Sequence, residues 1–224
     1  MCAIYRAAPT LTQQGERVIS TDEMTGVQAL ERKQPGLPLA PGKVERREFE
    51  YIRHGTLSFI ISRDVVTGQI VAPSSGPTRT KADFLAHMQG VIATDVAAHR
   101  WHFVVDNLDI HRSASLVRWV AHVSGLDIDL GVKDRRGILH NQASRTAFLT
   151  DPSHKIVFHY TPKHCSWLNQ VEIWLSILVR RLLQRGSFIS VDDLKIKILA
   201  FIEHYNATSA KPFTWTYQGK PLVA

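Results

Sequence analysis

The chain is poor in cysteine, since its 224 residues include only Cys2 and Cys165. Two cysteines exclude a disulfide framework and a cysteine-based zinc site. Long apolar runs are also missing, because none approaches the ~20 residues that span a bilayer. Residues 1–4 do not form a basic segment leading into an apolar run, so we expect no secretion signal. These absences favour a cytoplasmic protein that does not act at a membrane.

The composition that remains is that of an ordinary globular chain, with 44% hydrophobic and 21% charged residues. Its length fits one large domain or two small ones. The 27 basic residues exceed the 20 acidic ones, so the net charge is +7 and the pI is about 9.6. A basic surface of this kind attracts polyanions such as nucleic acid. Charge alone is equally compatible with a simply solvated basic surface.

Strand-like and helix-like segments alternate along the chain. The predicted strands cover residues 17–21, 51–62, 69–72, 101–105 and 156–160. The predicted helices cover residues 81–97, 112–122, 143–149 and 166–184, and a last one begins at Ser190. Residues 35–42 are rich in proline and glycine and indicate a surface loop. This order predicts an α/β domain built around a mixed sheet.

Two aspartates occupy comparable positions in this pattern. Asp22 and Asp106 each come directly after an apolar predicted strand. Functional sites of α/β sheets form at the carboxyl ends of neighbouring parallel strands. Two aspartates placed there repel each other unless a divalent metal offsets the repulsion. The same position is also typical of helix caps and turns, so neither residue is decisive alone.

A glutamate completes a possible set of three acids. Glu172 lies at the border of the apolar stripe of the predicted helix 166–184, with Asn169 and Ser176 on the same side. An isolated border glutamate is typically only solvated. Together with the two aspartates, it would supply the hard oxygen ligands that suit Mg²⁺ or Mn²⁺. Two such ions could activate the attacking oxygen and stabilise the leaving oxygen of a phosphodiester.

Longer strings of residues around these acids match a known family. They cover residues 20–32, 51–56, 104–111, 160–172 and 205–217, in that order. On these strings the chain resembles the catalytic domain of DDE (Asp-Asp-Glu) transposases, in the bacterial insertion-sequence branch related to mariner elements. The resemblance implies a ribonuclease H-like fold, with a mixed five-stranded sheet flanked by helices.

The resemblance also assigns the acids. It implies that Asp22, Asp106 and Glu172 are the catalytic residues and bind two Mg²⁺ or Mn²⁺ ions. The neighbouring Glu23 is not the first ligand, because the motif places Asp22 there. The implied reaction is hydrolysis at a transposon end, followed by attack of the freed 3′-hydroxyl on a target strand. The implied partners are double-stranded DNA, with insertion at TA sites, and a second copy of the chain in a homodimer.

Two further groups of residues are candidates for supporting roles. The polar group matches motif positions near the acids and would support them, contact DNA or be purely structural; it comprises Asn107, His111 and Asn169. The basic group ends the predicted helix 166–184 and would contact DNA phosphates or complement the helix dipole; it comprises Arg180, Arg181 and Arg185. Trp167 and Trp174 are expected in the core rather than as base-stacking platforms.

We expect a leader at residues 1–15, a catalytic domain at 16–210 and a tail at 211–224 that packs on the domain. Asp106 and Glu172 are 66 residues apart, more than in mariner relatives, and we place the extra length in a polar insertion at about 125–154. The family usually carries helix-turn-helix modules before the catalytic domain, and only about sixteen residues precede the first predicted strand.

Two alternatives remain open at this point. A truncated, inactive remnant would act only as a nucleic-acid-binding or dimerisation module. Another ribonuclease H-like nuclease would cleave RNA–DNA hybrids or branched junctions instead of transposon ends.

Overall fold

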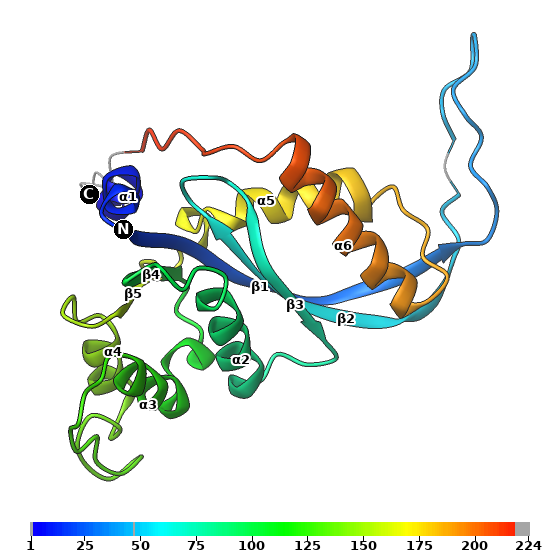
Figure 1. Cartoon of the computed structure of the whole chain (residues 1–224). Helices are drawn as coiled ribbons and strands as arrows, with labels where there is room; N and C mark the ends of the chain where they lie inside the picture. Colours follow the sequence, from blue (N-terminus) through cyan, green and yellow to red (C-terminus); the bar gives the residue numbers. More distant parts are fainter. Residues whose placement is uncertain (1, 47, 218–224) are drawn as a thin grey trace, which may run out of the picture.

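The computed structural model describes residues 2–46 and 48–217, so Met1 and the end of the expected tail at 218–224 lie outside the described residues. A five-stranded sheet forms its centre, in the order β3-β2-β1-β4-β5 (Figure 1). The strands are β1 (Glu16–Arg32), β2 (Tyr51–Asp64), β3 (Ile70–Gly76), β4 (Arg100–Val105) and β5 (Ile156–Tyr160). β1, β2 and β3 pair antiparallel, whereas β4 and β5 run parallel to β1. The predicted mixed five-stranded sheet is therefore confirmed.

Helices cover both faces of the sheet. In the described residues, the α-helices are α1 (Cys2–Gln13), α2 (Lys81–Ile92), α3 (Ala114–Val123), α4 (Gln142–Leu149), α5 (Val171–Leu178) and α6 (Val191–Thr208). On one face α2, α3 and α4 enclose a core around Phe84, Phe103 and Phe158. On the other face α5 and α6 pack over β1 and β2, and α1 covers a smaller cluster beside them. In the described part of the chain, no helix combines the length and apolar character needed to cross a membrane.

The first strand is much longer than predicted. β1 continues through Asp22 to Arg32, where the sequence pattern suggested an end at residue 21. The polar residues that follow position 21 pair with β2 on one side, which keeps the backbone extended despite a bulge between Met24 and Val27. Asp22 therefore lies within a central strand, beyond the part of β1 that pairs with β4.

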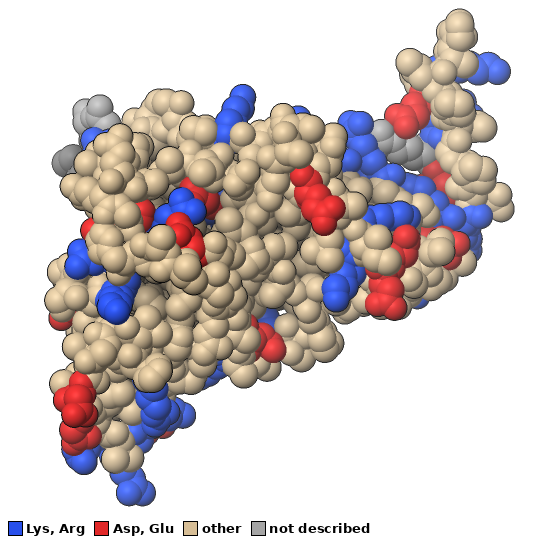
Figure 2. Space-filling model, viewed as in Figure 1, with Lys and Arg blue, Asp and Glu red and all other residues tan. Residues whose placement is uncertain are grey.

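β1 and β2 are joined by an arm, residues 33–50, that projects away from the body (Figure 1). Isolated bridges join Leu37 to Arg46 and Ala40 to Lys43, and Phe49 is 82% exposed. The predicted surface loop at 35–42 forms its outer half. Figure 2 shows Lys and Arg gathered on the arm and around its base, with Asp and Glu among them.

The predicted helix 166–184 is broken into three pieces. A 3₁₀ turn covers Ser166–Leu168, α5 follows at Val171–Leu178, and a π-helical turn covers Val179–Leu183. The break falls at Asn169, whose backbone is extended, with φ −80° and ψ 110°. Its side chain hydrogen-bonds β1 residues instead of lying along a helix face. The continuous helix predicted from the apolar stripe was therefore wrong, and Glu172 lies in the first turn of α5.

Two other helices are shorter than predicted for local reasons. α2 ends at Ile92 rather than 97, and its start is fixed by a capping box between Thr80 and Asp83. The helix predicted at 112–122 begins at Ala114, because Ser113 caps it by accepting a hydrogen bond from Leu116 N–H. Ser190 caps α6 as the sequence predicts.

Candidate active site

The three predicted acids come from elements that meet at one end of the sheet. Asp22 lies within β1, Asp106 directly follows the neighbouring parallel strand β4, and Glu172 is in the first turn of α5. Burial raises the pKa of the Asp22 carboxyl to about 7, and the negative charges of Asp106, Glu23 and Glu172 contribute to the rise. Asp22 thus lies within electrostatic reach of both other acids.

Asn169 determines how the Asp22 side chain is held. Its amide Nδ2 donates to Asp22 Oδ2 at 3.3 Å and to the Thr21 carbonyl at 2.9 Å. Its own oxygen accepts a hydrogen bond from the Ser20 hydroxyl, which in turn accepts from Val171 N–H at 2.9 Å. The start of α5 is therefore tied directly to the part of β1 that carries Asp22. Asn169 is fully buried, which favours the supporting role among those predicted for it.

His111 holds Asp106 from the other face of the sheet. Its Nδ1 lies 3.0 Å from Asp106 Oδ1, and its Nε2 lies 2.9 Å from Glu23 Oε1. Burial lowers the pKa of His111, but the two carboxylates outweigh it and raise that pKa to about 9. The imidazole is therefore positively charged at neutral pH, and its ring packs 4.4 Å from the Phe84 ring.

Asp106 itself stays ionised. Burial raises its pKa, but the hydrogen bonds from His111 and Leu108 N–H, together with the charges of His111 and Arg79, hold the pKa below its ordinary value. The His111 side chain is fully buried, which favours the supporting role among those predicted for it.

Asn107 links the ends of two strands. Its amide donates to the Thr161 carbonyl just beyond β5, and its oxygen accepts from Arg112. The Arg112 guanidinium lies over the Tyr160 ring, 4.4 Å from its centroid. Asn107 is half-buried and fixes the loop after β5 relative to Asp106.

A hollow of about 470 Å³ opens beside Glu172. It is lined by residues of β1 and α5, and Arg180 from the π-helical turn faces it. Arg181 lines a different hollow next to the tail, together with Tyr205 and Phe213. Arg185 is exposed beyond the turn and lines neither of these hollows. The structure therefore brings only Arg180 of the three predicted arginines to the hollow that contains Glu172.

The chemistry of these donors fits a hard divalent cation. Carboxylate oxygens are the ligands that Mg²⁺ and Mn²⁺ prefer, and the mutual repulsion felt by Asp22 is what such a cation relieves. Within residues 2–46 and 48–217, however, no three His, Cys, Asp or Glu side chains are spaced to hold one ion in common. Among these residues the acids lie at one edge of the sheet without forming a closed metal site.

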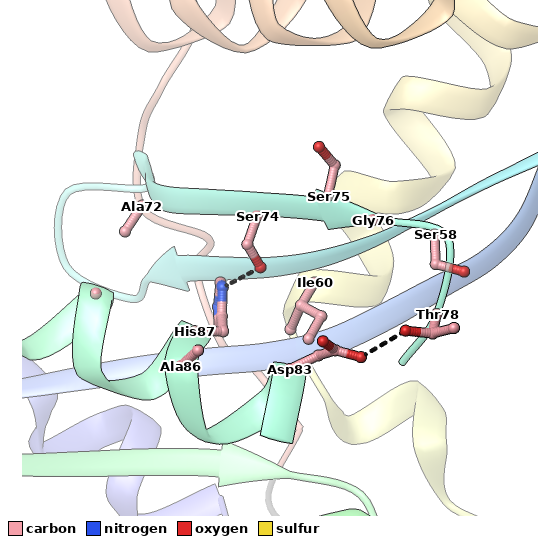
Figure 3. Close-up of a pocket in the computed structure, with 11 residues that line it drawn as sticks. Ser58, Ile60, Ala72, Ser74, Ser75, Gly76, Thr78, Asp83, Ala86 and His87 are labelled. Atoms are coloured by element: carbon pink, nitrogen blue, oxygen red, sulfur yellow. Dashed lines mark hydrogen bonds between the residues drawn. The ribbon is translucent and has the colours of Figure 1, made fainter. Parts of the chain in front are cut away.

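A second, smaller cavity of about 290 Å³ lies between β3 and α2 (Figure 3). His87 points into this region and lies 2.8 Å from both the Ser74 and Ser62 hydroxyls. Burial lowers the pKa of His87 to about 3, so the imidazole is neutral. The one lining carboxylate, Asp83, is engaged by Thr78 and Thr80 at the start of α2. This cavity has no charged group free for phosphodiester chemistry.

The two tryptophans of the glutamate segment differ. Trp174 is fully buried in the core, as predicted. Trp167 is 54% exposed, so its predicted core position was wrong. The break at Asn169 removes Trp167 from the helical stripe and leaves its ring against the edge of Tyr217, with the centroids 5.1 Å apart.

Several residues that organise this site were missed. The pairing of Glu23 with His111 was missed because residue 21 was taken as the end of the strand. Alternation along a continued strand would have placed Asp22 and Glu23 on opposite faces. The contacts of Tyr5 and Arg63 with residues 168–170 span more than 100 positions, and no local pattern reports them.

The site can now be compared with known proteins. A family model described as DDE superfamily endonuclease matches residues 17–195. No curated protein sequence gives a significant match. Among solved structures, the Mos1 mariner paired-end complex with Mn aligns at a TM-score of 0.56 and 12% identity, covering 91% of this chain and 53% of that chain. A pre-cleavage Mos1 transpososome aligns at a TM-score of 0.52 and 12% identity, covering 95% and 61%.

At this identity the structural likeness concerns the fold, which is the ribonuclease H-like fold expected from the sequence. The chain spans little more than half the length of the Mos1 chains that it matches. The family match, over residues 17–195, covers most of the chain, and this range includes all three acids. The chain therefore belongs to the DDE superfamily of endonucleases.

Proposed function

We propose that this chain is the catalytic domain of a transposase, a Mg²⁺- or Mn²⁺-dependent DNA nuclease and strand transferase. The observation that carries the proposal is the gathering of Asp22, Asp106 and Glu172 at one end of the sheet in a DDE superfamily endonuclease. The Mos1 neighbours are transposase complexes, two of them a paired-end complex with Mn and a strand transfer complex. They support a DNA substrate and a divalent metal for this chain.

In this proposal the three acids are the catalytic residues and hold two divalent ions. Such a pair of ions, when bound, activates the attacking oxygen and stabilises the leaving oxygen of a phosphodiester. Asn169 orients Asp22 by donating to its carboxylate. His111, itself held by Glu23, keeps Asp106 ionised and fixed. Arg180 faces the hollow beside Glu172 and would bind a DNA phosphate there.

The finer parts of the proposal follow the family resemblance. The substrate is double-stranded DNA, with hydrolysis at a transposon end followed by transfer of the 3′-hydroxyl to a target TA site. The active complex is a homodimer, working in the bacterial cytoplasm at the nucleoid. The catalytic unit comprises residues 16–210, including an insertion at about 125–154.

A nicking assay tests the function directly. Supercoiled plasmid carrying a transposon end is incubated with the chain, with and without Mg²⁺, and open-circle product is measured. Wild type should nick only with metal, whereas D22A, D106A and E172A should be inactive. Glu203 is an exposed acid on α6, so E203A is the matched control and should retain activity. Nicking by all three acid variants at the wild-type rate would refute the assignment.

The same assay separates the alternatives. A hybrid-cleaving or junction-resolving nuclease would prefer RNA–DNA hybrid or branched DNA over the transposon-end duplex. An inactive remnant would bind DNA but nick none of these substrates at any metal concentration.

A further inference from the structure

The segment after α6 packs on residues that hold the segment leading into α5. Residues 211–217 run from the end of α6 to α1, which places the two described ends of the chain close together (Figure 1). The Lys211 backbone passes so close to Gly68 that a Cβ on Gly68 would lie 2.1 Å from the Lys211 carbonyl oxygen. Gly68 also has a φ of +77°, so a side chain is disfavoured there for two reasons. The tail can therefore follow this path only because residue 68, in the turn between β2 and β3, is a glycine.

Two aromatic residues of the tail cover two polar side chains. The Phe213 ring lies against the Arg63 guanidinium, 3.8 Å from Cζ to the ring centroid. The Trp215 ring packs on the Tyr5 ring, with the centroids 4.8 Å apart. Arg63 also donates to the Lys211 carbonyl at 2.8 Å. Arg63 and Tyr5 are buried, whereas Phe213 and Trp215 are half-buried, so the two rings cover the polar side chains from the surface.

The same two polar side chains hold the segment that leads into α5. The Tyr5 hydroxyl donates to the Leu168 carbonyl at 2.9 Å and accepts from Gln170 N–H at 3.2 Å. Arg63 Nη1 donates to Gln170 Oε1 at 3.0 Å. Between these two anchors stands Asn169, whose amide holds Asp22. These three hydrogen bonds to residues 168 and 170 therefore all involve a side chain that the tail covers.

We propose that Phe213 and Trp215 are positioning residues, which set Asn169 and Glu172 against Asp22 by bracing Arg63 and Tyr5. The catalytic consequence rests on the proposed function, since it assumes that Asp22 and Glu172 act together. The structural part of the proposal does not rest on that function, because it concerns only how firmly residues 168–172 are held in place. Small displacements of a catalytic group cost rate steeply, so loosening this segment should reduce turnover more than folding.

The variants are chosen within the tail itself. F213A and W215A remove the two braces, while T214A and T216A change the exposed residues between and beyond them. W215F keeps an aromatic ring on Tyr5 and serves as the conservative rescue. Thermal unfolding of each variant establishes that it is folded before the other measurements.

Amide hydrogen exchange of residues 168–172 is the first readout. Exchange there should be faster in F213A and W215A than in wild type, and unchanged in T214A and T216A. W215F should restore most of the protection. This measurement needs no turnover, so it remains informative even if wild type nicks no DNA, an outcome that would count against the proposed function alone.

Steady-state nicking is the second readout. F213A and W215A should lose about 10- to 100-fold in kcat and need more Mn²⁺ for half-maximal rate, with KM for DNA little changed. Wild-type exchange and wild-type kcat in both variants would overturn the proposal. If either variant fails to fold, F213L and W215F test the proposal in its place. F213L should show the loss of kcat and W215F should not. The reverse pattern would also overturn the proposal.

Discussion

The side-chain amide of Asn169 donates to the Asp22 carboxylate at 3.3 Å, across 147 positions of sequence. This contact joins the residue before α5 to the middle of β1. It explains why the helix carrying Glu172 is interrupted at this point, since an unbroken helix would direct Asn169 along its own surface. The interruption is therefore part of the site.

Replacing Asn169 should show how much its hydrogen bond to Asp22 contributes to activity while the Asp22 carboxylate itself is kept. N169A removes the donor to Asp22 and leaves the Thr21 carbonyl without its amide partner, at a cost of about 1–3 kcal/mol in unfolding free energy. We expect nicking to fall about 10- to 100-fold, as for other residues that orient metal ligands. Urea unfolding and plasmid nicking measure the two effects. Q14A, at an exposed position that does not line the hollow beside Glu172, is the control.

The raised pKa of Asp22 predicts a pH-dependent cost to folding. Its ordinary value is 3.8 and its value in the fold is about 7, so the folded state binds a proton that the unfolded state has released between these limits. Stability from this group is thus present at acid pH and falls as pH rises toward 7. At pH 8 without metal, D22N should raise the unfolding free energy on the order of 2 kcal/mol. No gain in D22N at pH 8 would contradict the buried, crowded carboxylate.

Metal binding should offset the loss of stability that the ionised Asp22 carboxylate causes. If Mg²⁺ binds the acids of the folded state only, it raises the melting temperature with concentration, and more strongly at pH 8 than at pH 5.5, where protons compete. Differential scanning calorimetry with Mg²⁺ and with EDTA measures the shift. D22A and E172A should show little of it, and E203A should match wild type.

His111 should make the folding stability depend on pH in a second range, above the one set by Asp22. Its pKa rises from 6.5 to about 9 on folding, so the stability contributed by the charged imidazole is complete below 6.5 and lost as pH rises through 9. H111Q should therefore lack the decline between pH 7 and 10 that wild type shows in urea. Because it leaves Glu23 and Asp106 without their shared cation, it should also be less stable by about 3 kcal/mol at pH 6.5. An unchanged wild-type stability from pH 7 to 10 would rule out the charged pair.

The arginines should differ in their effect on DNA affinity. Arg180 faces the hollow beside Glu172, whereas Arg181 lines the hollow near the tail. R180A should weaken binding of a duplex transposon end and lower the slope of log affinity against log salt by about 1. R181A should change both the affinity for the duplex and this salt dependence less than R180A does. Fluorescence anisotropy over a range of salt concentrations compares them, and equal losses would show that the hollow does not select the phosphate path.

Local patterns were sufficient for most of the strands, whereas the choice of Asp22, Asp106 and Glu172 as catalytic residues also needed the family resemblance and stays a prediction. β4 and β5 appear in the sequence as short apolar runs, and the parallel pairing of β1 with β4 follows from the α/β order. The full length of β1 was not predictable in this way, because polar residues and register shifts interrupt the apolar pattern of residues 22–32, which are kept extended by their pairing with β2. The break at Asn169 was hidden for a similar reason: tertiary hydrogen bonds override a strong apolar stripe. Local sequence does not encode partners such as Tyr5 and Arg63.

The order of strands has a consequence for the chain during synthesis. β1 and β2 are joined by the arm, and β2 and β3 by a short turn, so these three strands are close in sequence and can pair early. β4 must return to β1 only after the arm, two strands and α2, and α5 arrives later still. An incomplete nascent chain, or a gene copy interrupted before position 172, therefore never assembles the three acids. The proposed catalytic centre therefore forms only once translation has passed that glutamate.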